Sequence, residues 1–361
     1  MKLKRLTALL LSVMMVLSLA ACGGGGDTKD DSASGDLSGK TIIIGNITPV
    51  TGAQAAYGLA ITNSIQVAID EINAAGGILG ATVKLSTKDD QGTPAEAVSG
   101  FNSLLSEGAS AIIGATLSSC TSAITSLSDD EGIVLVTPSS TADSITTKDD
   151  YVFRSCFKDS FQGEMVAAYA KDQGWTKAAV LYATGDTYSS GLHDSFVKAA
   201  EKYGIEIVCE QSSSDTGAVD FSSQLATIAA SGADMLFAPY YYDAVGPKII
   251  PQAREAGFKG AIMGCDGFDG TQDYTTGDLS AYENVYFTNH YSPEDSSEIV
   301  QNYVKNYTAK YGSESMNALG ALASVWRSTT ARSSRSSGPT APARPPRCTP
   351  SPASCPLKAA L

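Results

Sequence analysis

The chain has 361 residues, of which 17% are charged and 43% hydrophobic, and its formal net charge is -13 at pH 7. This length predicts about two domains, each large enough for its own core. The acidic balance excludes nucleic acid as a partner, because affinity for phosphate backbones comes largely from Lys and Arg. Seven cysteines over this length exclude a disulfide-dense mini-scaffold, and a single long apolar run excludes a multi-span membrane protein.

The N-terminus has the pattern of an export signal. Basic residues at positions 2, 4 and 5 precede an apolar stretch at 6–19, and small residues follow before Cys22. This order is typical of a secretory signal, and the apolar stretch is too short to span a bilayer comfortably. We therefore predict a signal peptide over residues 1–21 and an exported protein.

The residues around Cys22 suggest a membrane anchor. Leu19-Ala20-Ala21-Cys22 resembles the bacterial lipoprotein box, in which the cysteine is lipidated and becomes the first residue of the mature protein. Residues 22–40 are largely Gly, Ser, Thr and Asp, which is typical of a flexible linker. We expect a lipid anchor through Cys22, on the outer face of the cell membrane or in the periplasm. The alternative is an ordinary cleaved signal with an incidental cysteine.

From residue 41 onward, β-branched runs alternate with amphipathic helical patterns. Strands are predicted at 41–45, 82–87, 111–114, 133–136, 178–182, 205–208, 235–238, 261–263 and 285–288, and the alternation restarts after residues 151–153. Helices are predicted at 61–72, from 94, and at 119–130, 161–171, 190–202, 221–230, 244–256 and 298–311. Repeated strand–helix units predict parallel sheets with helices on both faces. Two such series predict an α/β protein with two doubly wound lobes.

Polar residues follow the predicted strands, where ligands bind in such folds. Hydroxyl groups gather after the first series of strands, and tyrosines with Asp266 gather after the second. Ser118 opens a helix, where free amides and the helix dipole favour a small anion, and Asp266 suits a cation. This distribution predicts a zwitterionic ligand between aromatic walls. Helix capping by Ser118 and a turn at Asp266 are the structural alternatives.

Many short motifs in this order resemble one family, the leucine/isoleucine/valine-binding periplasmic solute receptors of branched-chain amino acid ABC importers. The resemblance extends from about Thr41 to Ala323. Its motifs are Gly45-Asn46-Ile47-Thr48-Pro49-Val50-Thr51-Gly52 with Tyr57-Gly58, residues 68–78 with Gly80, Lys88-Asp89-Asp90 before Pro94-Ala95-Glu96-Ala97, Ile113-Gly114, residues 130–133, Thr137-Pro138, Phe153-Arg154 and residues 252–257.

The resemblance implies a type I periplasmic-binding-protein fold, in which two lobes joined by three crossings close on one solute. Lobe 1 would comprise residues 41–158 with 290–326 returning to it, and lobe 2 residues 159–289. The implied partners are an amino acid and the membrane permease subunits of an ABC transporter. The resemblance implies no cofactor and no metal, and we expect a monomer.

The resemblance also assigns roles to individual residues. Ser118, Ser139 and Thr141 would hold the α-carboxylate and ammonium of an amino acid, and Asp266 would meet the ammonium. Aromatic residues that line the site fall at Tyr57, Tyr188 and Tyr242. Asp266 stands where well-known members have Glu, and Ser139 where they have Ala. These departures leave the particular amino acid open, and related receptors bind amides, urea and aromatic acids.

Residues 327–361 differ from the rest of the chain. They hold seven of the fourteen prolines, five arginines and one lysine, and no acidic residue. Such a Pro- and Ser-rich segment cannot bury a core. We interpret it as an atypical basic tail that is disordered or out of frame, because the resembling family continues here with further elements. A natural disordered tail and a polyanion-binding segment are the alternatives.

An enzyme and a signalling sensor are the rival functions. The chain has no GxSxG or HExxH motif and no zinc-type Cys/His cluster, which argues against an enzyme. Its two histidines, His193 and His290, lie on different predicted elements, and His193 is expected on a helix surface. A ligand sensor for a membrane kinase or chemoreceptor would share the fold and the site, so the sequence does not separate it from a transport receptor.

Overall fold

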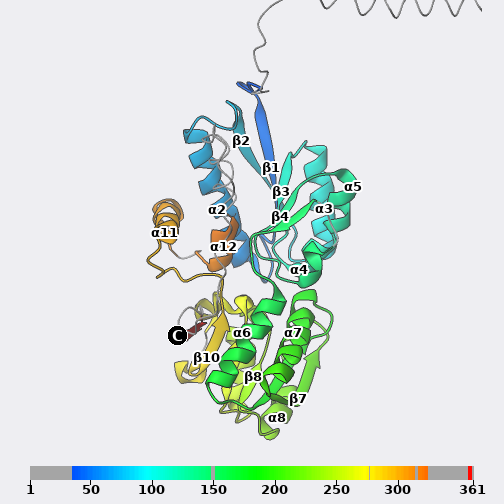
Figure 1. Ribbon diagram of the computed structural model, residues 1–361, viewed down its shortest axis with the longest axis vertical. Helices are drawn as coiled ribbons and strands as arrows, with labels where there is room; N and C mark the ends of the chain where they lie inside the picture. The colour runs from blue at the N-terminus through cyan, green and yellow to red at the C-terminus, as the bar shows by residue number, and fades with distance from the viewer. Residues whose placement is uncertain (1–34, 148–150, 276, 314–315, 324–356, 360–361) are drawn as a thin grey trace, which may run out of the picture. The chain divides into compact units, whose positions relative to one another are not determined.

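The computed structural model of the protein describes residues 35–147, 151–275, 277–313, 316–323 and 357–359. The signal peptide, Cys22 and most of the predicted tail therefore lie outside the described residues. The described residues from Ser38 onward belong to one compact unit. This unit contains two separate β-sheets, each with its own helices, which we call lobe 1 and lobe 2 (Figure 1).

Lobe 1 is built on a five-stranded parallel sheet with the order β2-β1-β3-β4-β5. Its elements are β1 Thr41–Thr48, α2 Ala55–Ala74, β2 Thr82–Asp89, α3 Pro94–Ser106, β3 Ala111–Ile113, α4 Ser118–Ser122, α5 Thr125–Glu131, β4 Leu135–Thr137, η1 Asp143–Thr146 and β5 Val152–Arg154. Local sequence explains the helix starts: at α3, Thr93 accepts a hydrogen bond from the Glu96 amide and Pro94 occupies the first turn. The close approach of β1 and β3 requires Gly114, since a Cβ there would lie 2.4 Å from the Ile47 carbonyl oxygen.

Lobe 2 is built on a six-stranded sheet with the order β11-β10-β9-β8-β6-β7. Its elements are α6 Asp159–Asp172, β6 Lys177–Ala183, α7 Thr187–Tyr203, β7 Glu206–Ser213, α8 Ser222–Ala230, β8 Met235–Phe237, α9 Tyr242–Ala244, the π-helix η2 Val245–Ile249, α10 Ile250–Glu255, β9 Ala261–Gly264, η3 Asp266–Phe268, η4 Thr271–Tyr274, η5 Leu279–Tyr282, β10 Val285–Thr288 and β11 Leu357–Ala359. Five strands run parallel, and β11 pairs antiparallel with β10. The two doubly wound lobes predicted from the sequence are confirmed.

After β10 the chain returns to lobe 1. Helices α11 (Glu298–Tyr311) and α12 (Ala318–Ala323) pack against α2, as Figure 1 shows for α12. The Tyr303 hydroxyl lies 2.9 Å from the Ser64 hydroxyl, and Asn63 donates to the Tyr307 hydroxyl at 3.2 Å. Because α6 and α11 each follow a passage from one lobe to the other, the segments before them are the described crossings between lobes.

Two predicted helices are interrupted. The helix predicted at 119–130 is divided into α4 and α5 between Ser122 and Thr125, and just before this break the Thr121 hydroxyl contacts the carbonyl groups of Ala115 and Leu117. The helix predicted at 244–256 begins at Tyr242 and passes through the π-helix η2. Pro247 and Pro251 lack the amide hydrogens that a regular α-helix needs there. The strand β11 had no signal in the sequence of the tail.

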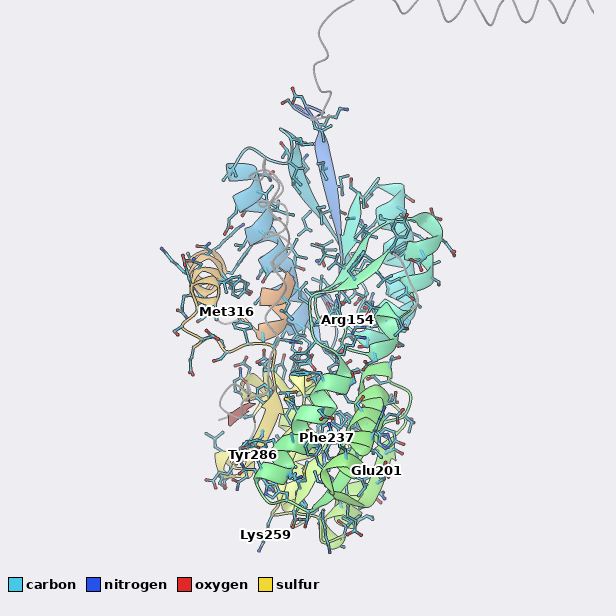
Figure 2. All side chains as sticks on the ribbon, in the orientation of Figure 1. Arg154, Glu201, Phe237, Lys259, Tyr286 and Met316 are labelled. Atoms are coloured by element: carbon cyan, nitrogen blue, oxygen red, sulfur yellow. The ribbon has the colours of Figure 1, made fainter. Side chains whose placement is uncertain are left out.

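The hydrophobic core is continuous from lobe 1 to the inner face of lobe 2. Ile47, Phe101 and Leu135 of lobe 1 belong to the same buried cluster as Phe196 and Phe237 of lobe 2. The rings of Phe196 and Phe237 lie 4.4 Å apart, and Figure 2 marks Phe237 inside lobe 2. A second cluster fills the outer layer of lobe 2. Among the described helices, none is long and apolar enough to cross a membrane.

Candidate functional site

Tyrosines join the two lobes directly. Tyr57, on the first turn of α2, donates to the Gly267 carbonyl at 2.7 Å and to the Asp269 carbonyl at 2.9 Å. Tyr242, at the start of α9, donates in the other direction to the Ala53 carbonyl at 2.9 Å. The two rings meet edge to face with centroids 4.7 Å apart. The predicted site residues Tyr57 and Tyr242 therefore lie together, and their hydroxyl groups hold lobe 1 against lobe 2.

The lobe 1 side of the site is formed by hydroxyl groups after β3 and β4. Ser118, Ser139 and Thr141 are all buried. The Ser118 hydroxyl accepts a hydrogen bond from the Ala142 amide at 3.3 Å, and the Ser139 hydroxyl donates to the Thr116 carbonyl at 2.8 Å. The Thr141 hydroxyl is buried and has no hydrogen-bond partner. The three predicted hydroxyl groups thus lie on adjacent loops. They differ in whether the proton, the oxygen or both remain available for a further hydrogen bond.

Arg154 fixes the loop that carries these hydroxyls. It ends β5, and its guanidinium donates to the carbonyl groups of Ser140 at 3.0 Å, Thr141 at 2.9 Å and Ala142 at 2.8 Å. It also donates to the Thr146 hydroxyl at 2.9 Å. One cation therefore satisfies the carbonyls of a whole loop, which leaves the side chains of that loop free for other contacts.

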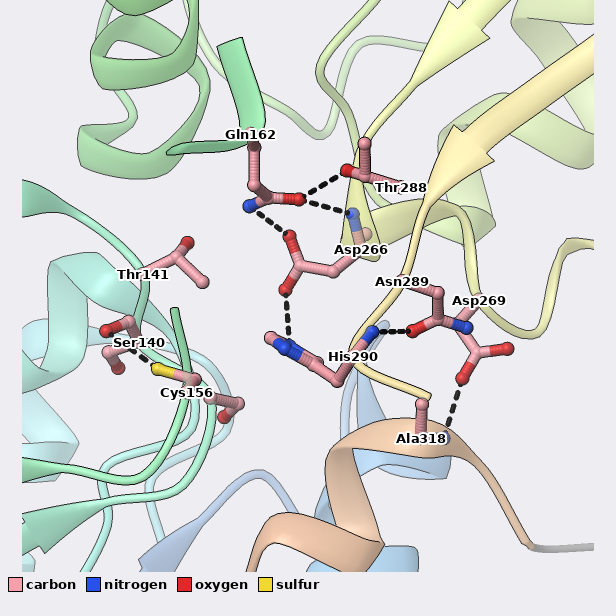
Figure 3. A network of polar contacts seen from close by, with 12 residues as sticks. Ser140, Thr141, Cys156, Gln162, Asp266, Asp269, Thr288, Asn289, His290 and Ala318 are labelled. Carbon is pink, nitrogen blue, oxygen red and sulfur yellow. Dashed lines mark hydrogen bonds and ion pairs between the residues drawn. The ribbon is translucent and has the colours of Figure 1, made fainter. Parts of the chain in front are cut away.

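Asp266 is the centre of a buried network in lobe 2 (Figure 3). Its Oδ1 accepts hydrogen bonds from Gln162 Nε2 at 2.8 Å and from the Tyr188 hydroxyl at 3.0 Å. Its Oδ2 lies 3.3 Å from His290 Nε2. Gln162 is itself held by the Thr288 hydroxyl, which donates to its Oε1 at 2.6 Å. The predicted residues Asp266 and Tyr188 are therefore in direct contact, and the carboxylate has one fixed orientation.

Several buried polar atoms near this network lack partners. Neither carboxylate oxygen of Asp159, at the start of α6, has a hydrogen-bond partner, and the Tyr241 hydroxyl has none. Tyr241 stacks on Tyr188 with ring centroids 4.9 Å apart. Figure 3 shows Thr141 of lobe 1 on one side and Asp266 of lobe 2 on the other. Buried polar groups in native proteins are almost always paired, so these atoms indicate a site for a polar ligand.

The electrostatics of the site favour a cation. Burial raises the pKa of Asp159 well above its usual range, and the charge of Asp266 raises it further. A buried carboxylate of this kind is stabilised when a positive charge comes next to it. Asp159 and Asp266 together thus form an acidic end of the site, which a ligand ammonium group would complete.

The thiols around the site are not activated nucleophiles. Burial raises the pKa of Cys156 to about 12, and it raises the pKa of the Cys120 thiol even further. Burial also raises the pKa of Cys265 well above its usual range. Reactive cysteines have a lowered pKa, because the thiolate is the nucleophile. These three thiols therefore lack the lowered pKa of a reactive cysteine; Cys120 and Cys265 are buried, and Cys156 is half-buried.

Sequence reasoning placed all seven predicted ligand residues at buried positions but missed four of their neighbours. Asp159, Gln162, Tyr241 and His290 were not predicted as site residues. Asp159 and Tyr241 had a usable signal, since each directly follows a strand or crossing that leads to the site. Gln162 and His290 had none, because an amide within a helix and a histidine after a strand have many ordinary roles.

We expect the two interlobe tyrosine hydroxyls to stabilise the closed arrangement. The double variant Tyr57→Phe, Tyr242→Phe keeps both rings and removes the hydrogen bonds, each worth about 1 kcal/mol. Small-angle X-ray scattering should show a larger radius of gyration for this variant than for the wild type. Tyr282→Phe is the matched control, because its hydroxyl donates at 2.7 Å to the Gly246 carbonyl within lobe 2. An unchanged radius in the double variant would contradict this role.

Comparisons with known proteins agree with the geometry. The chain is 32% identical over 250 residues to Leu/Ile/Val-binding protein homolog 3 of Brucella melitensis, covering 69% of this chain and 67% of that protein. It is 31% identical over 249 residues to the Leu/Ile/Val-binding protein BraC3 of Rhizobium johnstonii, with the same coverage of 69% and 67%.

Two solved structures are also similar to it. One is LivJ from Streptococcus pneumoniae, a branched-chain amino acid transporter substrate-binding protein in complex with isoleucine; it is 33% identical, with a TM-score of 0.74, covering 80% of this chain and 82% of that one. The other is the leucine-binding protein LivK from Thermotoga maritima, 30% identical with a TM-score of 0.72, covering 78% of this chain and 79% of that one. Residues 41–331 match the family described as periplasmic binding protein, and this chain therefore belongs to that family.

Proposed function

We propose that this protein is an extracytoplasmic receptor that binds one amino acid, branched-chain or related, between its two lobes and delivers it to the permease of an ABC transporter. The observation that carries the proposal is the set of buried, unpartnered polar atoms at one place. Thr141 contributes from lobe 1, and Asp159 and Tyr241 contribute from lobe 2. The similarity to receptors for Leu, Ile and Val supports an amino acid as the missing partner.

The hydrogen bonds already made support a different proposed role for each hydroxyl. The Ser118 oxygen accepts from an amide, so its own proton is free to go to the ligand carboxylate. The Ser139 proton is used on the Thr116 carbonyl, so its oxygen is left to accept from the ligand ammonium. The Thr141 hydroxyl can both donate a hydrogen bond to the ligand and accept one from it. One amino acid backbone thus matches three hydroxyls that differ in the direction of their hydrogen bonds.

The acidic end of the site would hold the ammonium. Asp266 is oriented by Gln162 and Tyr188, and Asp159 lies at the start of α6 without a partner. The rings of Tyr57, Tyr188 and Tyr242 would surround the apolar side chain of the ligand. Because tyrosine has an apolar body and a polar tip, these rings can contact a branched side chain while their hydroxyls remain hydrogen-bonded.

Binding and closure are then one process. Each lobe alone offers only part of the ligand's hydrogen bonds, so an amino acid binds most tightly when both lobes contact it. The ligand shifts the population toward the closed form by the difference between its affinities for the two forms. A permease that recognises the closed form would receive the loaded receptor in preference to the empty one.

The proposal extends to location. We propose that residues 1–21 direct export, that lipid on Cys22 anchors the protein, and that residues 22–40 tether it to the membrane. A single tethered monomer would then present its closed form to the permease beside it. We propose that the segment 327–361 is an atypical tail outside the binding machinery. Three of its residues, Leu357–Ala359, form the strand β11.

A thermal-shift scan tests the function. Residues 23–361 would be melted with each of the twenty amino acids, urea and small amides. Isoleucine at 100 times its Kd should stabilise the protein by about 2.7 kcal/mol, a shift of several degrees. A shift caused by a chemically related group of amino acids supports the proposal and identifies the specificity. A cooperative melt that none of the amino acids shifts would overturn it.

We expect Asp266→Ala to weaken amino acid binding at least tenfold, about 1.4 kcal/mol, because the ammonium loses a counter-charge. Isothermal titration calorimetry measures this, and a melting curve of the variant shows that it is folded. The control is Asp273→Ala, which removes an exposed carboxylate from the same lobe and should leave the affinity unchanged. Equal affinity in the wild type and Asp266→Ala would remove Asp266 from the site.

Asp159→Asn should have opposite effects on stability and binding. Burial raises the pKa of Asp159, so its ionised form destabilises the unliganded protein as the pH rises above the usual Asp pKa. The variant should therefore melt higher without ligand, by about 1 kcal/mol or more near pH 8, and the gain should shrink as the pH falls. Its affinity for the amino acid should fall at least tenfold. Asp273→Asn is the control, and a lower melting temperature in Asp159→Asn would contradict the prediction.

A further inference from the structure

His290 lies where the two described crossings between the lobes meet. It follows β10 on the segment that leads to α11, and its ring packs at a tilt against Phe157, which lies on the segment from β5 to α6. The ring centroids are 4.0 Å apart. The His290 side chain is only 2% exposed and that of Asp266 only 3%. The imidazole is therefore fixed between a hinge residue and the carboxylate that we propose as the ammonium ligand.

The geometry leaves the ligand one place on Asp266, and His290 is next to it. A carboxylate oxygen accepts about two hydrogen bonds. Oδ1 already accepts two, from Gln162 and Tyr188, whereas Oδ2 has only His290 at 3.3 Å. A ligand ammonium at Asp266 would therefore share Oδ2 with the imidazole, within about 4–5 Å of it. At that distance in a buried site, two positive charges repel strongly enough to change an affinity by at least about tenfold.

We infer that His290 is a positioning residue for Asp266, and that its proton and the ligand ammonium exclude one another at Oδ2. This inference rests on the proposed function. Neutral His290 donates from Nε2 and aligns the carboxylate, which keeps its full charge for the ammonium. Protonated His290 neutralises that carboxylate and repels the ligand. Affinity for the amino acid therefore falls as the pH falls and His290 takes up a proton.

Other ionisable groups face the same place and must be separated from His290. Burial raises the pKa of Asp269, which follows η3, and the charge of His290 opposes this rise. Asp266 interacts electrostatically with Asp159 on α6, Tyr188 on α7 and Cys156 on the crossing. Asp159 is the important competitor, because its protonation also weakens ammonium binding at low pH. A measurement on the His290 ring itself avoids this ambiguity.

The chain offers such a measurement, because it contains only two histidines. In tag-free protein, the imidazole Cε1–H signals in proton–carbon correlation NMR spectra report each histidine separately, and His193→Gln assigns them. The pH would be varied from 5 to 9 with and without saturating isoleucine. We expect the titration midpoint of His290 to fall by at least one pH unit with ligand. His193, which lies between Asp194 and Glu210 at 2.9 Å from each, should keep its midpoint and serves as the internal control.

Binding measurements provide the reciprocal test, since the effect of ligand on the proton equals the effect of the proton on ligand. His290→Gln keeps a neutral donor and should bind within a few-fold of the wild type at pH 8, with a shallower pH dependence below pH 7. His290→Leu lacks the donor and should bind more weakly at every pH, with melting curves to confirm folding. A His290 midpoint that is unchanged or higher with isoleucine bound overturns the inference while the receptor function stands. Failure of every amino acid to bind at any pH overturns the proposed function, and this inference with it.

Discussion

The structure depends on charged groups kept away from water between two lobes. Asp159 and Asp266 are both buried, and burying an unpaired carboxylate costs several kcal/mol in a protein interior. Asp266 has its cost offset by Gln162, Tyr188 and His290, whereas Asp159 has no hydrogen-bond partner. Under the proposed function, a small zwitterion would supply the missing positive charge, and the energy that holds the lobes together would then depend on the presence of the solute.

The closed form is built from two kinds of contact with different purposes. Tyr57 and Tyr242 connect the lobes by hydrogen bonds to backbone carbonyl groups. These hydrogen bonds do not involve a ligand. Thr141, Asp159 and Tyr241 have buried polar atoms without hydrogen-bond partners, which we propose to bind the ligand. If every polar group were satisfied by the protein itself, closure would not need a solute and the receptor could not distinguish loaded from empty. The division between satisfied and unsatisfied groups is therefore what makes closure responsive to a ligand.

Much of the fold could be predicted from the sequence, because parallel strands and their helices leave strong periodic patterns. The runs at Thr41–Thr48 and Lys177–Ala183 are examples, since both are β-branched or small and bury most of their length. Prolines 247 and 251 could have warned of an irregular helix, but the π-helical form there depends on packing that no local pattern encodes. The strand Leu357–Ala359 was not predicted, because its pairing with β10 joins segments that are far apart in the chain.

The site was harder to predict than the fold. Resemblance to a family predicted Ser118, Thr141 and Asp266 as ligand residues, but it could not show which hydroxyl still has a proton to donate. That property depends on the Ala142 amide and the Thr116 carbonyl, which approach only after folding. Asp159 escaped notice because an acidic residue in the first turn of a helix is usually there to balance the helix dipole. Only its burial without a partner distinguishes it from that ordinary role.

Arg154 has a consequence for the kinetics of capture. Its guanidinium binds the carbonyls of Ser140, Thr141 and Ala142, so the lobe 1 loop is ordered before any solute arrives. A preformed half-site does not have to lose conformational entropy on encounter, which favours rapid association on lobe 1. Escape of the solute, in contrast, has to wait until the tyrosine contacts across the lobes break. With Arg154 ordering this loop at the end of an edge strand, the association rate depends on the preformed half-site of lobe 1. The residence time of the solute depends instead on the contacts between the lobes.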